Sequence, residues 1–126
     1  MIKGARYYSF LRFIGLLFLI GVLAISLWPF SEQSEMLVFN DKLIHFVTFA
    51  FLMIWFTGVF KRTSYLKIFL FLFLYGLSIE IIQSFTTYRF MSLGDLLADL
   101  VGLCLGYAAV LFGFDRWPQW LKVKIP

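Results

Sequence analysis

The chain has 126 residues, of which 62% are hydrophobic and 14% are charged, and its formal net charge is +4. Soluble globular domains are about 45–50% apolar and about 25% charged. The composition therefore excludes a water-soluble globular domain and a disordered tail, and the single Cys104 excludes a disulfide-stapled scaffold. The basic residues lie between apolar runs, so we predict no nucleic-acid partner and expect an all-α integral membrane protein.

Four apolar runs are long enough to cross a bilayer, whose hydrocarbon core of about 30 Å needs roughly 20 residues of helix. The predicted helices are about 13–30, 43–60, 67–88 and 93–114. They form a single domain, 1–126, a bundle of four transmembrane helices. A cleaved signal peptide is an alternative for the first run, but its apolar part is too long, and cleavage would leave the other three helices in the same orientation.

The Lys and Arg residues predict the orientation of this bundle, because cytoplasmic loops carry an excess of them. The N-terminal flank, the loop after the second helix and the C-terminal tail are basic, whereas the other two loops hold only Lys42 and Arg89. We therefore expect a multi-pass protein with both termini cytoplasmic and loops 31–42 and 89–92 outside. The aromatic belts agree: Trp28 and Tyr88 fall near the outer interface, and near the inner one fall Tyr7, Tyr8, Tyr65, Trp117 and Trp120.

Ionisable residues within the spans are informative because each costs roughly 2.5–3.5 kcal/mol at the centre of a helix on insertion scales. At about 1.5 Å per residue, His45 lies about 6 Å, Asp99 about 9 Å and Glu80 about 12 Å below the outer interface. The polar residues of the outer half and its rim are Asp41, Lys42, His45, Glu80, Gln83, Arg89, Asp95 and Asp99. The inner half of the spans has no ionisable residue. This asymmetry predicts a ligand-binding polar pocket among the second, third and fourth helices, open to the external face or outer leaflet.

Purely structural roles are also open for several of these residues. They are capping of the second helix by Asn40 or Asp41, a capping box formed by Ser92 and Asp95, snorkelling by Lys42, termination of the third helix by Arg89 and packing by His45. Glu80 and Asp99 lie outside the terminal turns, so a function or a structural ion pair with Arg89 or His45 is the prediction for both.

Known catalytic and metal-binding spacings do not match this set. A metal would use His45 with Glu80, Asp95 or Asp99, but no H-E-x-x-H, C-x-x-C or carboxylate-His i, i+3 pattern is present, so no metal and no cofactor is predicted. The nearby hydroxyl groups belong to Ser84, Thr86, Thr87 and Ser92, and none has the signature of a positioned nucleophile. The spacing alone therefore leaves catalysis undecided.

The charge mixture indicates what kind of ligand would fit the predicted pocket. The second and fourth helices both begin at the outer surface, so their N-terminal amides favour an anion. Lys42, His45 and Arg89 add positive character, and the carboxylates oppose it. Such a site suits a zwitterionic, amine-bearing or hydrogen-bond-rich head group better than a bare phosphate.

A stripe of small residues, Ala98, Gly102 and Gly106, follows one face of the fourth helix. Stripes of this kind let another helix approach closely. We favour packing within the bundle over dimerisation, although a homo-oligomer through these residues is an alternative.

The polar residues also form an ordered set along the chain. This set, Asp41-Lys42-x-x-His45-Phe46, Glu80-x-x-Gln83, Arg89, Asp95, Asp99 and Gly102, resembles the VanZ-like family of small bacterial membrane proteins over about residues 37–110. The first helix matches only as a hydrophobic segment. The resemblance implies a bacterial cell membrane location and an association with resistance to the lipoglycopeptide teicoplanin, without an established biochemical mechanism.

Three functions are consistent with these features. The leading hypothesis is a non-enzymatic protein that binds a lipid-linked or cell-envelope ligand in the outer leaflet. The second is a membrane-embedded enzyme that modifies a lipid or cell-wall head group, with His45 as general base. The third is a small proton-coupled exporter with Glu80 as the titrating group, although transport sites usually lie near the midplane.

Overall fold

A computed structural model describes residues 2–27, 35–86 and 93–124, with the backbone alone described at 2–4, 35–41 and 122–124. The described elements are all helical: α1 (Ile2–Ser26), α2 (Glu35–Val59), a 3-10 turn η1 (Arg62–Ser64), α3 (Tyr65–Ser84), α4 (Leu93–Leu111), a second 3-10 turn η2 (Phe114–Arg116) and α5 (Trp117–Lys124). Four segments are long and apolar enough to cross a membrane: Ala5–Ser26, Lys42–Val59, Arg62–Ser84 and Leu93–Leu111. The predicted all-α fold with four candidate spans is confirmed.

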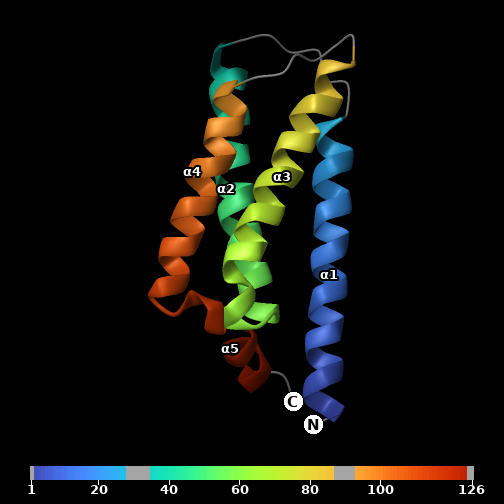
Figure 1. Ribbon diagram of the computed structural model, residues 1–126, viewed down its shortest axis with the longest axis vertical. Helices are drawn as coiled ribbons and strands as arrows, with labels where there is room; N and C mark the ends of the chain where they lie inside the picture. The colour runs from blue at the N-terminus through green and yellow to red at the C-terminus, as the bar shows by residue number, and fades with distance from the viewer. Residues whose placement is uncertain (1, 28–34, 87–92, 125–126) are drawn as a thin grey trace.

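The four long helices form an up-and-down bundle (Figure 1). Helices α2 and α4 have the most extensive contact, α3 packs against both, and α1 contacts α2 and α3. The beginning of α1 and the short α5 lie together at one end, which we call the basic end. A hydrogen bond from the Tyr7 hydroxyl to the carbonyl oxygen of Pro118, at 2.7 Å, joins them there.

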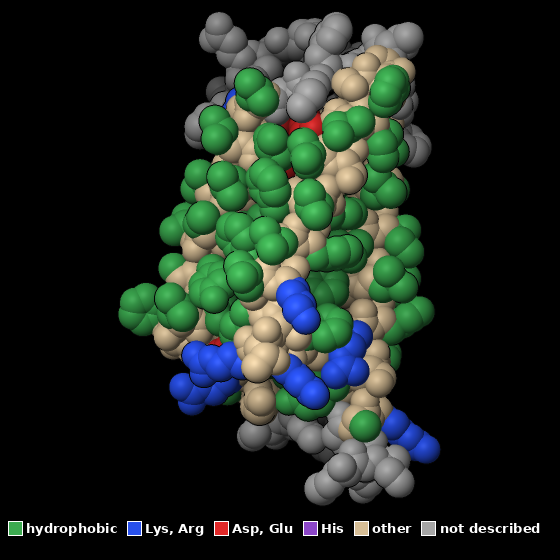
Figure 2. Space-filling model, viewed as in Figure 1, with side chains coloured by type: hydrophobic (Ala, Val, Ile, Leu, Met, Phe, Trp, Pro, Cys, Tyr) green, Lys and Arg blue, Asp and Glu red, His purple; other side chains and the backbone are tan. Residues whose placement is uncertain are grey.

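The exposed Lys and Arg side chains gather toward the basic end, whereas apolar side chains cover most of the rest of the face in view (Figure 2). The described exposed basic residues are Arg6, Arg12, Lys61, Arg62, Lys67 and Arg116. This separation is the charge asymmetry used to predict the orientation. That the basic end faces the cytoplasm stays a prediction.

Helix α2 begins earlier than its apolar run indicates, at Glu35 instead of near residue 43. The sequence 35–42 has no Gly or Pro to interrupt a helix, so the helix continues beyond the apolar segment. Asn40 and Asp41 consequently lie inside α2, and the prediction that one of them caps this helix is wrong. Helix α1 likewise begins at Ile2, before the expected residue 13.

Helix α4 ends at Leu111, three residues before the expected end. The cause is Gly113, which has φ 99°, a left-handed conformation that favours glycine and commonly ends helices. The amide of Gly113 donates a hydrogen bond to the carbonyl oxygen of Val110 at 2.9 Å, which closes the last turn. The chain then turns back beneath the bundle through η2.

The short helix α5 is not predicted from the sequence, because its eight residues contain no long apolar run. Trp117 Nε1 donates a hydrogen bond to the carbonyl oxygen of Ile54 in α2 at 2.9 Å. Gly58 makes room for this ring, since a Cβ atom there would lie 2.3 Å from Trp117 Nε1. Trp117 is thus half-buried against α2 instead of being only an interfacial belt residue, whereas Trp120 is exposed.

The core lies between α2, α3 and α4. Phe49, Leu52 and Met53 of α2, Leu72 of α3 and Leu103 of α4 are almost fully buried. Many other large apolar side chains are exposed, as expected for a bundle whose outer surface faces lipid.

Candidate functional site

Five of the predicted site residues are buried side chains on three different helices. They are His45 of α2, Glu80 and Gln83 of α3, and Asp95 and Asp99 of α4. Glu80 and Asp99 expose only 0% and 1% of their surface. Because almost none of their surface is exposed, these two carboxyl groups lie inside the protein and do not face lipid.

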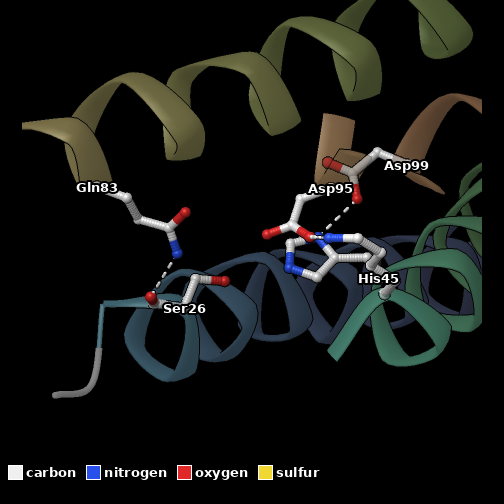
Figure 3. A network of polar contacts seen from close by, with 6 residues as sticks. Ser26, His45, Gln83, Asp95 and Asp99 are labelled. Carbon is white, nitrogen blue, oxygen red and sulfur yellow. Dashed lines mark hydrogen bonds and ion pairs between the residues drawn. The ribbon is translucent and has the colours of Figure 1, made fainter. Parts of the chain in front are cut away.

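The centre of the site is a pair formed by His45 and Asp99. A hydrogen bond joins His45 Nδ1 to Asp99 Oδ1 at 2.7 Å (Figure 3). When Asp99 is ionised, Nδ1 carries the proton and donates the hydrogen bond to the carboxylate oxygen. The predicted pairing of His45 with a carboxylate is therefore present, between helices α2 and α4.

The small residues of α4 explain why these two side chains can meet. A Cβ atom on Gly102 would lie 2.3 Å from the carbonyl oxygen of Phe46, and one on Gly106 would lie 2.8 Å from that of Ala50. Both glycines therefore allow the backbone of α4 to approach that of α2 closely. Gly102 is one turn from Asp99, and Phe46 directly follows His45, so this close approach brings the pair together. The stripe packs within the chain, as favoured from the sequence.

Helix α3 contributes Glu80 to the same cluster. Glu80, His45 and Asp99 each offer one ligand atom, and these three atoms all lie within 4.8 Å of one another. Gly76, one turn before Glu80, leaves space for the carboxylate of Asp99, because a Cβ there would lie 2.8 Å from Asp99 Oδ2. We call His45, Glu80 and Asp99 the buried triad.

A second ion pair extends the cluster toward the surface. Lys42 Nζ donates a hydrogen bond to Asp95 Oδ1 at 2.8 Å, and the two side chains are 39% and 9% exposed. Asp95 lies one turn before Asp99 on α4, and Lys42 lies nearly one turn before His45 on α2. The pair therefore joins α2 to α4 at the rim of the cluster. Ser92, the other half of the predicted capping box, lies outside the described residues.

The remaining predicted site residues are placed differently. The side-chain amide of Gln83 donates a hydrogen bond to the carbonyl oxygen of Ser26 at 2.7 Å, and Figure 3 shows it directed to α1, apart from the His45–Asp99 pair. Gln83 thus ties α3 to the end of α1. Asp41 lies in α2, but its side chain is outside the described part of the structure, and Arg89 lies entirely outside it.

The comparison with known families agrees with this arrangement. The family model described as VanZ/LLP1 matches residues 12–114, which is most of the chain. The chain belongs to the VanZ/LLP1 family. The match is wider than residues 37–110, since it includes most of α1. No curated protein and no solved structure matches the chain.

Two cavities in this VanZ/LLP1 chain lie toward the basic end and not at the buried triad. One, of about 450 Å³, lies between α1, α2 and α3 and is lined mainly by apolar side chains, with Arg12 and Lys67 among the others. The second, of about 300 Å³, is lined by residues that include Tyr65 and Asp115. At the cluster itself, the side chain of Lys42 is 39% exposed and that of Asp95 is 9% exposed.

The described charges of this VanZ/LLP1 site are unbalanced. Glu80, Asp95 and Asp99 bring three carboxyl groups, whereas Lys42 is the one permanent cation of the described cluster and His45 is charged only when protonated. Electrostatic interactions are stronger where water is excluded.

Sequence reasoning missed the part that Gly76 plays in this site. Gly76 and Glu80 are four residues apart, so they lie on the same face of α3. The only signal in the sequence is that a glycine and a glutamate share one face of a helix otherwise rich in Phe and Leu. In this chain, that face of α3 accommodates the carboxylate of Asp99.

Proposed function

We propose that this protein binds a cell-envelope or outer-leaflet ligand at the polar cluster of α2, α3 and α4. The observation that carries the proposal is the convergence of two fully buried carboxyl groups, Glu80 and Asp99, with His45. Buried ionisable groups are expensive in a membrane and usually mark a functional site. A bundle of this size could be held together by apolar packing and its glycine contacts alone.

The three carboxyl groups described at the cluster, those of Glu80, Asp95 and Asp99, support an amine-bearing or zwitterionic head group as the part of the ligand that is recognised. A cationic amine can be hydrogen-bonded by carboxylates, and such charge-assisted bonds are about twice as strong as neutral ones. Asp95 and Lys42 at the rim provide one acceptor and one cation within the same pair. A zwitterion could contact both of them as it enters.

The prediction that the basic end faces the cytoplasm supports access from the external side. The cluster lies on the other side of the bundle centre from the basic end, near the beginnings of spans Lys42–Val59 and Leu93–Leu111. If those ends face outward, a head group in the outer leaflet is within reach of Lys42 and Asp95.

Native mass spectrometry of lipids retained by the purified protein tests this proposal. We expect wild type to retain an envelope lipid that Asp99→Asn loses. The matched control is Asp115→Asn, which makes the same chemical change at the basic end, where Asp115 accepts a hydrogen bond from Tyr65 at 2.5 Å. An identical lipid profile in wild type, Asp99→Asn and Asp95→Asn would contradict the proposed function.

We also propose that ligand binding contributes to teicoplanin resistance, as the family resemblance implies. Expression of wild type in a susceptible bacterial host should raise the teicoplanin concentration needed to stop growth, and Asp99→Asn should lose this effect at equal abundance. If wild type and Asp99→Asn change the inhibitory teicoplanin concentration equally, the polar cluster is not responsible for resistance.

A specific observation also supports an enzyme as the second candidate. The His45–Asp99 hydrogen bond has the arrangement of a general base oriented by a carboxylate. The described hydroxyls of Ser84 and Thr86 donate hydrogen bonds to carbonyl oxygens of α3. For this candidate function we propose water or a group of the ligand as the reacting nucleophile. Incubation of the protein with envelope lipids should then give a product that is lost in His45→Gln, and the absence of any such product favours the binding protein.

A further inference from the structure

We infer that His45, Glu80 and Asp99 form a binding site for a divalent transition-metal ion, and that zinc fits the donor set best. This inference goes beyond the proposed binding of an envelope ligand, since it concerns a metal ion held by three side chains of the protein. The known metal-binding spacings are absent because the three donors come from three different helices.

The chemistry of the donors supports zinc. Imidazole nitrogen and carboxylate oxygen are both common zinc ligands, and sites with three protein ligands keep a fourth position open for water or another molecule. An imidazole favours zinc and related ions over magnesium or calcium, which prefer oxygen ligands alone. The buried triad offers one nitrogen donor and two carboxylate donors.

The charge of the triad supports a divalent ion in particular. Glu80 and Asp99 are almost completely buried in a region where charge separation is costly. Two carboxylates and a neutral imidazole carry a charge of about −2, which one divalent cation neutralises.

The donor atoms are close enough for one ion after small movements of the side chains. The donor atoms lie within 4.8 Å of one another, whereas ligands about 2.1 Å from a tetrahedral zinc ion are about 3.4 Å apart. Metal binding would require side-chain rotations that bring the donors to this separation. Gly76 has no Cβ atom, and one there would lie only 2.8 Å from Asp99 Oδ2.

Metal analysis of tag-free protein tests the inference. Purified wild type is stripped with a chelator, exposed to zinc, dialysed and analysed by mass spectrometry for zinc per chain. We expect about one zinc ion per chain in wild type and an affinity at least about tenfold lower in Glu80→Gln and Asp99→Asn. Asp115→Asn is the matched acidic control, and Cys104→Ser shows whether the lone thiol captures zinc; both should keep wild-type affinity.

Cobalt(II) provides a readout that does not depend on any variant folding. Cobalt-loaded wild type should show the visible absorption of a low-symmetry nitrogen- and oxygen-ligated ion, and zinc should abolish it. Failure of wild type to retain zinc or cobalt, or equal retention in well-folded Glu80→Gln, would overturn the inference.

The same preparations separate this inference from the proposed function. A lipid profile that depends on Asp99 in chelator-treated protein, without zinc retention, supports ligand binding and refutes the metal site. Zinc retention by the triad, with no retained lipid that depends on Asp99 or Asp95, supports the metal site and refutes the proposed ligand binding.

Discussion

Replacement of Gly102 by alanine tests whether close approach of α2 and α4 builds the site. The added Cβ would lie 2.3 Å from the carbonyl oxygen of Phe46, whereas real Cβ atoms essentially never come within 3.0 Å of a neighbour. The two helices must therefore separate locally by at least about 0.7 Å. Overpacking of this kind costs typically about 1–3 kcal/mol, and the better helix propensity of alanine returns up to about 1 kcal/mol.

We expect Gly102→Ala to lower the free energy of unfolding by about 1–2 kcal/mol. Gly106→Ala should be milder, because its Cβ would lie 2.8 Å from the carbonyl oxygen of Ala50, and Gly21→Ala should be neutral or stabilising, because nothing lies within 4 Å. Reversible unfolding in mixed micelles, followed by circular dichroism, measures all three. Equal stabilities of Gly102→Ala and Gly21→Ala would refute the reasoning.

Three further predictions concern the rim, the orientation and α5. A double-mutant cycle of Lys42→Ala and Asp95→Ala in the same unfolding assay should give a coupling of only about 0.2–1 kcal/mol, because Lys42 is 39% exposed; zero coupling would mean that the pair does not join the helices. Thr63→Cys in a Cys104→Ser background should react with a membrane-impermeant maleimide only after cells are opened; labelling of intact cells would reverse the predicted orientation. Trp117→Phe removes one hydrogen bond to α2 and should cost about 1 kcal/mol, seen as faster hydrogen exchange in α5; unchanged exchange would contradict the docking of this helix.

The sequence predicts the membrane fold well because the bilayer imposes a simple rule. A helix that satisfies its own backbone must be apolar over about 20 residues, and this rule depends on composition along the chain alone. It finds the four spans but says nothing about where a helix continues into water. The early starts of α1 and α2 and the existence of α5 therefore required the structure.

The sequence predicts the depth of the site residues in the membrane, but not which of them meet. The depth of His45, Glu80 and Asp99 follows from their position along each helix, because the rise per residue is fixed. Which helix face meets which neighbour depends on packing between helices, and the sequence does not contain the crossing geometry explicitly. Gln83 illustrates the limit: its spacing from Glu80 suggests a shared site, yet its amide binds the carbonyl oxygen of Ser26 in α1.

By itself, the sequence determined four apolar spans, a basic end and an uneven distribution of polar residues along the membrane normal, since each is a property of residue order and helix rise. Only the tertiary structure decided that His45 and Asp99 meet at 2.7 Å and that Glu80 joins them. The physical reason is that glycines on α3 and α4 remove the side-chain volume that would otherwise hold the helices and their polar groups apart.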